Sequence, residues 1–123
     1  YQVTTVFTSA KNAANERGQT SDFIKAFSMG AFDYNAAMID KANGEDGVNE
    51  MVDLIHKYVY NDRPREKAAP SIINGTMRIN EGARLNTASV QDQLSWFQSE
   101  GLIDGDITLD TFVDTSYVET FQA

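Results

Sequence analysis

The sequence contains no cysteine, which excludes disulfide bonds and thiolate metal sites and leaves the redox compartment open. It contains one histidine, His56, with no further ligands at a metal-binding spacing and no nucleophile close to it in the sequence. We therefore predict neither a metal site nor a general base at His56, and no cofactor for the chain. No apolar run approaches the roughly 20 residues that a membrane-spanning helix needs.

Basic residues are also few. The 10 Lys and Arg side chains are outnumbered by 18 Asp and Glu, which gives a formal net charge of -8, and they form no cluster. Because proteins that bind DNA or RNA neutralise phosphates with clustered Lys and Arg, we expect no nucleic-acid partner. The sequence also lacks a Ser/His/Asp order, a glycine-rich phosphate loop and a paired-carboxylate motif, so we predict no enzyme activity.

The chain begins at Tyr1, with no basic and apolar leader. From this we expect a processed product or an excised piece of a longer protein. With 123 residues, 41% of them hydrophobic, there is room for one domain with one core. We accordingly interpret residues 1–123 as a single, partial domain.

Val3–Thr8 is rich in β-branched and aromatic residues and is the one strand that the sequence predicts. Bulky side chains alternate onto both faces, which is typical of a strand buried in a sheet. A lone strand leaves backbone donors and acceptors unpaired along both edges, so we expect it to pair with a second copy or to lie poorly ordered. One strand with several helices does not complete a two-layer α/β domain, which again indicates a piece of a larger protein.

Helical periodicity predicts three helices before residue 75. The first runs from Thr20 or Ser21 to about Lys41, after a connection that is helical in part, and the second covers 46–60. A short third helix enters at 62–64 and ends at Pro70. The buried stripe of the first helix comprises Phe23, Phe27, Ala31, Tyr34 and Met38. That of the second comprises Met51, Leu54, Ile55, Tyr58 and Val59.

A further helix and a glycine stop are predicted in the stretch from Arg84 to Tyr117. Asn86 or Thr87 caps the helix, because a short polar side chain accepts an amide hydrogen that the first turn leaves unpaired. Its apolar stripe comprises Val90, Leu94 and Phe97. Gly101 ends the helix in a left-handed conformation, which places Leu102 back against Phe97.

The residues after this glycine carry turn and cap signals. Asp104-Gly105 predicts a turn, and Thr108 caps a short helix that runs through Leu109, Phe112 and Val113. These signals concern packing and chain direction. Nothing in this part of the sequence predicts a reaction centre.

The same stretch carries a resemblance to a known family. RLNTASVQDQL followed by WFQSEGLIDGDITLDTFVDTSYVE resembles the C-terminal end of the solute-binding proteins of nitrate/sulfonate/taurine-type ABC importers. That family includes binders of thiamine-pyrimidine precursors and is related to thiamine-pyrimidine synthases. The pattern is an aromatic pair before a Gly-Leu stop, an acidic spacer, and Val-Asp-Thr-Ser-Tyr. Its residues here are Trp96, Phe97, Gly101, Leu102, Val113, Asp114, Thr115, Ser116 and Tyr117.

The resemblance implies a fold class and a function. The chain would be the mostly helical C-terminal part of an α/β, type II periplasmic-binding-protein fold, with one N-terminal strand followed by about five helices. In this family two lobes close over a small solute, and the closed form docks on a membrane permease, outside the cytoplasm. The resemblance therefore implies a periplasmic or extracytoplasmic location and, as partners, a small solute and an ABC permease.

The resemblance also implies where ligand contacts lie, since the family's cleft forms at strand ends. Just after the predicted strand come Thr8, Ser9 and Asn12, whose hydroxyl and amide groups suit a sulfonate, carboxylate or pyrimidine. The alternative is that the three residues only cap the segment that follows. Two further functions stay open: a fragment of a thiamine-pyrimidine synthase-like enzyme, and a small helical interaction module whose strand pairs across a dimer.

Overall fold

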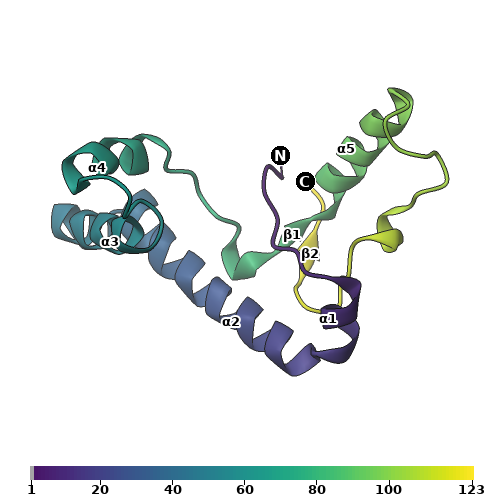
Figure 1. Ribbon diagram of the computed structural model, residues 1–123, viewed down its shortest axis with the longest axis horizontal. Coiled ribbons are helices and arrows are strands. Elements are labelled where there is room, and N and C mark those ends of the chain that lie inside the picture. The colour runs from purple at the N-terminus through teal and green to yellow at the C-terminus, as the bar shows by residue number, and fades with distance from the viewer. Residues whose placement is uncertain (1) are drawn as a thin grey trace. The chain divides into compact units, whose positions relative to one another are not determined.

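The computed structural model describes residues 2–123, whose contacts group into two compact units (Figure 1). Unit 1 comprises the residues up to Ser28 together with Gly82–Ala123, and unit 2 comprises Met29–Glu81. Helix α2 (Arg17–Tyr34) contributes residues to both units. Over residues 2–123 the fold is mostly helical, with five α-helices and a two-stranded parallel sheet. None of these helices is long and apolar enough to cross a membrane.

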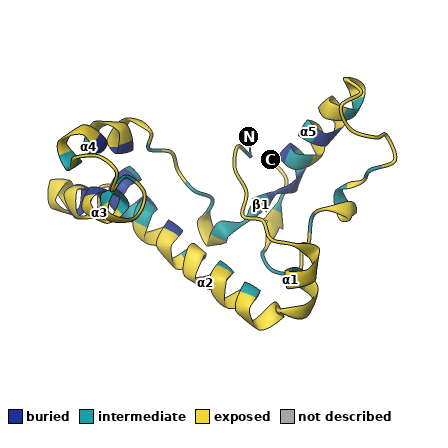
Figure 2. Cartoon of the chain, viewed as in Figure 1, coloured by how far each residue is buried: buried dark blue, intermediate teal, exposed yellow. Residues whose placement is uncertain are grey.

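Unit 2 is built from helices that share one small core. The last part of α2 continues into a π-helical turn, η1 (Asn35–Ile39), and two helices follow, α3 (Gly44–Tyr58) and α4 (Arg65–Asn74). The buried core residues are Ala37, Met38, Val48, Val52, Ala68 and Ile72, which gather where these elements meet (Figure 2). The predicted first helix is thus confirmed in outline. Only the C-terminal end of its predicted stripe reaches the core, because Phe23 and Phe27 are 61% and 36% exposed.

The buried face of α3 differs from the predicted one. Val48 and Val52 are buried, whereas Leu54 is 50% exposed and Tyr58 is 69% exposed. At 3.6 residues per turn, Leu54 lies about half a turn around the helix from Val52, so both cannot face the same core. The predicted stripe was right for Met51 and Ile55, which are partly buried against the core, and wrong for Leu54 and Tyr58. The segment carries apolar residues on two faces, and periodicity alone does not select between them.

Helix α4 also continues further than predicted. Pro70 lies inside it, and the helix ends at Asn74. Proline removes one backbone hydrogen bond and ordinarily kinks or ends a helix. Ala68 and Ile72, on either side of Pro70, are 0% and 7% exposed and pack into the core of unit 2. Their burial compensates for the lost hydrogen bond, so the helix continues.

Unit 1 combines the chain's two ends. Its elements besides α2 are α1 (Ala10–Asn15), the end of the 3-10 turn η2 (Glu81–Ala83), β1 (Leu85–Asn86), α5 (Thr87–Ser99), η3 (Leu109–Thr111) and β2 (Thr120–Phe121). Strands β1 and β2 pair in parallel, with Leu85 opposite Thr120 and Asn86 opposite Phe121. This minimal sheet joins the start of α5 to the end of the chain.

The predicted strand Val3–Thr8 is not a strand in the structure. Its six residues have no regular secondary structure and are exposed, and the one sheet in residues 2–123 is formed elsewhere, by β1 and β2. The reason is physical: β propensity is realised only when a neighbouring strand accepts the backbone hydrogen bonds, and the described chain offers none to this segment. The sequence was therefore wrong about the conformation of this segment.

The predicted left-handed stop of α5 at Gly101 is confirmed. Gly101 has a positive φ of 67°. The amide of Leu102 donates to the carbonyl of Phe97 (2.9 Å), and the amide of Gly101 donates to the carbonyl of Gln98 (3.0 Å). These are the two hydrogen bonds of a Schellman motif, which reverses the chain at a helix end. At the other end, the Asn86 side chain accepts from the amide of Ser89 (3.1 Å), as the predicted cap does.

The short helix after this stop is confirmed as a single turn, η3. The amide of Thr108 donates to Oγ1 of Thr111 (3.3 Å), and the amide of Thr111 donates back to the carbonyl of Thr108 (3.0 Å). The turn is therefore held locally. Phe112, which the sequence placed in this helix, follows the turn and is 55% exposed.

Replacing Gly101 with Ala should lower the free energy of unfolding by about 1 kcal/mol, because an L side chain is strained at this φ. No atom lies within 4 Å of an added Cβ at Gly101 or at Gly105, and only Gly101 has a positive φ. G105A is therefore the matched control, with an unchanged or slightly raised stability. Urea unfolding of both variants checks the prediction, and an equal loss in the two would contradict it.

Replacing Val52 with Ala should lower the free energy of unfolding by about 2 kcal/mol, because two buried methyl groups and their contacts are lost. The same truncation at the half-exposed Leu54 should cost less than about 0.5 kcal/mol. The two variants lie on opposite faces of α3, so chemical unfolding followed by circular dichroism tests which face is buried. A larger loss for L54A would restore the face predicted from the sequence.

Candidate functional site

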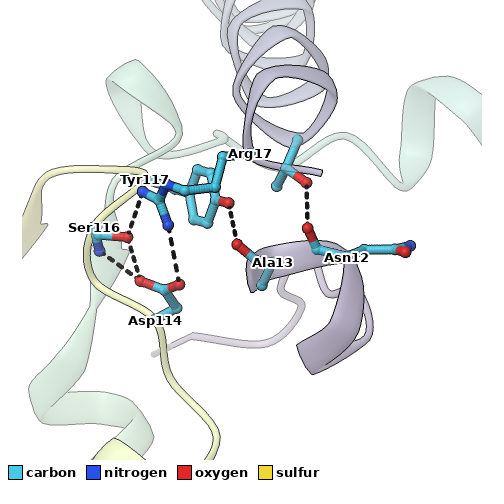
Figure 3. A network of polar contacts seen from close by, with 7 residues as sticks. Asn12, Ala13, Arg17, Asp114, Ser116 and Tyr117 are labelled. Carbon is cyan, nitrogen blue, oxygen red and sulfur yellow. Dashed lines mark hydrogen bonds and ion pairs between the residues drawn. The ribbon is translucent and has the colours of Figure 1, made fainter. Parts of the chain in front are cut away.

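An exposed polar cluster in unit 1 is formed by Arg17, Asp114, Ser116 and Tyr117, which we call the C-terminal clamp (Figure 3). The Tyr117 hydroxyl donates to the carbonyl of Ala13 in α1 (2.6 Å). Nη2 of Arg17, the first residue of α2, donates to Oγ of Ser116 (2.9 Å), and its guanidinium carbon lies 4.3 Å from the centroid of the Tyr117 ring. The clamp thus fastens the chain after η3 to the junction of α1 and α2.

Asp114 organises the turn on which the clamp is built. Its Oδ1 accepts from the amide of Ser116 (2.9 Å) and from the hydroxyl of Ser116 (2.5 Å). The hydroxyl hydrogen bond, followed by the amide hydrogen bond and the charge of Arg17, lowers the pKa of Asp114 below its ordinary value of 3.8. The carboxylate is therefore ionised at neutral pH and lies 4.0 Å from Nη1 of Arg17.

The clamp holds backbone segments together, and most of its polar groups are already engaged in contacts with one another or with the backbone. Few of them are available to bind a ligand. The side chains of Arg17 and Asp114 are 52% and 44% exposed, so their ion pair is screened by water and contributes little by itself. The Arg17 guanidinium, the group that would attract an anion, already contacts a carboxylate, a hydroxyl and an aromatic ring. The geometry of the clamp therefore suits a structural role, in which it holds the chain after η3 against α1 and α2.

The three predicted ligand residues lie together at the start of α1. Ser9 is the N-cap, and its Oγ accepts from the amide of Asn12 (3.1 Å). Nδ2 of Asn12 donates to Oγ1 of Thr8 (3.3 Å). All three residues are exposed. The structure therefore shows the capping arrangement that the sequence left open as an alternative, and solute binding by these residues stays a prediction.

An open hollow of about 490 Å³ lies on unit 1 beside α5 and contains none of those three residues. It is lined by Thr87, Ala88, Gln91, Asp92, Ser95, Leu109 and Gln122. Hydroxyl and amide groups dominate the lining, with one carboxylate and one large apolar side chain. Such a surface offers hydrogen bonds but little apolar area, whereas well-formed ligand sites combine a mostly apolar wall with a few polar groups.

His56 has a structural contact in unit 2. Its Nε2–H donates to the carbonyl of Arg63 (2.7 Å), which ties the end of α3 to the loop before α4. Among residues 2–123, no three His, Cys, Asp or Glu side chains lie close enough together to hold a metal ion. Within the described residues, His56 therefore has no neighbouring side chains that would form a metal site with it.

Sequence reasoning did not identify the clamp as a unit. Asp114, Ser116 and Tyr117 were noted as part of the Val-Asp-Thr-Ser-Tyr pattern, but Arg17 was not singled out at all. The contacts of Arg17 and Tyr117 join residues about a hundred positions apart in the chain. Periodicity and capping rules report on neighbours within a few residues, so they carry no signal for such pairs.

Replacing Ser116 with Ala should raise the pKa of Asp114 toward 3.8, because the main hydrogen bond to the carboxylate is lost. T115A, one residue away and without a bond to Asp114, is the control and should leave that pKa unchanged. Because the folded-state pKa is lowered, the contribution to stability is present above about pH 4 and is lost as the pH falls through the folded value. NMR titration of the Asp114 carboxyl carbon measures the effect, and equal pKa values in wild type and S116A would contradict it.

Comparison of the chain with protein-family models, curated proteins and solved structures found no match. No fold family is therefore identified beyond the mostly helical architecture with its two-stranded parallel sheet. The resemblance of Arg84–Tyr117 to solute-binding proteins rests on the residues quoted for it and stays a prediction.

Proposed function

We propose that this chain is the C-terminal part of the solute-binding component of an ABC importer for a small sulfonate, nitrate, taurine or pyrimidine-precursor solute. In this proposal the chain carries no catalytic step. It belongs to a two-lobed, type II periplasmic-binding-protein fold that works outside the cytoplasm and delivers its solute to a membrane permease.

The observation that carries the proposal is the exposure of large apolar side chains in both units. In unit 1 these include Phe7, Phe23, Trp96 and Phe112, which are 90%, 61%, 55% and 55% exposed. In unit 2 they include Phe32, at 71%. Large apolar side chains that are this exposed are available to pack against another protein surface. Helices that cover the lobe of a larger α/β protein would carry such side chains on their inner face.

The local structure of Arg84–Tyr117 supports the proposal as well. The resemblance requires a helix stop at Gly101 and Leu102, and these residues form the Schellman turn. The pattern also includes Asp114, Ser116 and Tyr117, which form a tight turn. The contacts of the clamp hold this turn against α1 and the start of α2. The conspicuous residues of the pattern are thus the ones that set the path of the chain.

In a two-lobed binding protein, the solute shifts a hinge equilibrium by contacting both lobes in the closed state. Thr8, Ser9 and Asn12 would supply hydroxyl and amide groups on one side of such a cleft. In the structure these groups bond to one another, so a solute has to replace weak local hydrogen bonds only. Most of the remaining contacts would come from the other lobe, and residues 1–123 alone should bind solute weakly or not at all.

The proposal is tested by recovering the coding sequence that contains this chain and expressing the full protein. Titration calorimetry with taurine, nitrate, an alkanesulfonate and an aminopyrimidine precursor should then show binding of one of them by the full protein and none by residues 1–123. Asn12→Ala should weaken that binding by roughly tenfold, the equivalent of about 1.4 kcal/mol, because a solute hydrogen bond is lost. Asn15→Ala, in the same exposed helix, is the matched control.

Two results would overturn the proposal. One is a coding sequence that contains residues 1–123 alone, with no further lobes. The other is a full protein that binds none of the four solutes. The exposed apolar side chains also favour a second function, a helical interaction module, and the first of these results would support that function instead.

A further inference from the structure

The segment Val3–Thr8 has unused hydrogen-bonding capacity along its backbone. No backbone-to-backbone hydrogen bond joins any of its residues to another described residue. The carbonyl of Thr4 accepts from the side chain of Gln2 (2.7 Å), which is a local contact. The side chains are exposed too, with Val3 at 71%, Val6 at 42% and Phe7 at 90%. A neighbouring strand would satisfy these backbone donors and acceptors.

Both ends of this segment are fixed to unit 1. At its start, the amide of Gln2 donates to Oγ of Ser89 (2.8 Å), its carbonyl accepts from Nε2 of Gln93 (2.9 Å), and its Oε1 accepts from the amide of Asn86 (3.2 Å). At its other end, Ser9 caps α1. A segment held at both ends loses less conformational entropy when it binds than a free terminus does.

The segment is also free of charge, in a chain whose formal net charge is -8. No Asp, Glu, Lys or Arg occurs before Lys11. Natural edge strands are commonly protected from pairing by charged side chains or proline, and Val3–Thr8 carries neither. Two copies of this acidic chain can therefore approach along the segment without bringing like charges directly opposite each other.

We propose that Val3–Thr8 pairs with the same segment of a second copy as an antiparallel two-stranded ribbon, with a two-fold axis through Thr5. A two-fold contact is self-complementary by symmetry. In this register Thr5 lies opposite Thr5 of the other copy, and Val3 lies opposite Phe7. By symmetry the Val3–Phe7 pair occurs twice, and both copies fall on one face of the ribbon together with the Thr5 pair, since alternate residues share a face. Aromatic and β-branched side chains placed opposite each other are favourable cross-strand pairs.

The register makes the proposal testable by disulfide formation, because the natural chain has no cysteine. Residues directly opposite in an antiparallel pair have Cα atoms roughly 4.5–5.5 Å apart, within the range that a disulfide spans. Thr5→Cys should therefore form a covalent dimer under mild oxidation. Thr4→Cys is the matched control, because Thr4 lies opposite Val6 and is too far from its own copy. We expect cross-linking of T5C to be at least tenfold faster than that of T4C.

Sedimentation velocity over a range of concentrations gives a readout that needs no cysteine. The wild-type chain should dimerise, and more strongly at high salt, which screens the repulsion between two acidic chains. Phe7→Lys should weaken dimerisation at least tenfold by removing an apolar cross-strand pair. Phe32→Lys makes the same change of charge on a similarly exposed Phe of α2 and should leave dimerisation unchanged.

Each other outcome overturns the inference. Equal cross-linking of T5C and T4C means collision without a register, and a dimer in which neither cross-links has another register or interface. Equal weakening by F7K and F32K means non-specific association through exposed apolar side chains. A wild-type chain that stays monomeric at every concentration shows that this segment does not pair with a second copy. The far-ultraviolet circular dichroism of all variants verifies that they are folded.

Discussion

Unit 1 depends on the buried amide of Asn86, which is 6% exposed. Its Oδ1 accepts from the amide of Ser89, its Nδ2 donates to the carbonyl of Ala123 (3.2 Å), and its own backbone amide donates to Gln2 (3.2 Å). One residue thus joins the beginning of the chain, the end of the chain and the start of α5. A buried amide that loses a partner costs free energy, so these hydrogen bonds specify a single arrangement even where little apolar surface is buried. The parallel pairing of β1 with β2 follows from the same placement.

Unit 2 also contains a buried asparagine whose side-chain amide joins separate segments of the chain. Asn35, 5% exposed, donates from Nδ2 to the carbonyl of Ile79 (2.7 Å) and accepts on Oδ1 from the amide of Ile79 (3.0 Å). The side-chain amide imitates a strand neighbour and fixes the segment after α4 beside the π-helical turn η1, which Asn35 begins. Irregular segments need such partners, because they have no helix or sheet to satisfy their backbone groups. In both units a buried asparagine does this where the chain has no regular structure.

The parts of the fold that the sequence predicted are those controlled by neighbouring residues. The cap at Asn86, the left-handed stop at Gly101 and the turn at Thr108 each depend on contacts within five positions, and all three are found. The features that were predicted wrongly are those that depend on residues far away in the sequence. Whether α3 buries Val52 or Leu54 depends on where η1 and α4 lie. Whether Val3–Thr8 becomes a strand depends on a neighbouring strand that residues 2–123 do not supply. The clamp and the two buried asparagines were not predicted as contacts for the same reason, since their partners lie tens of residues away.

The buried apolar side chains of this chain are smaller than many of its exposed ones. Its buried apolar residues are mainly small, with three Ala and two Val among them, while no Phe or Trp of the described residues is fully buried. Burying one large apolar side chain contributes about 1.5–3 kcal/mol, so several exposed aromatics together approach the 5–15 kcal/mol that holds a typical domain folded. Hydrogen bonds to Asn35 and Asn86 can specify the path of the chain, but they add little net stability. Any surface that covered these aromatics, such as the proposed lobe or a second copy, would stabilise the folded chain by binding to it.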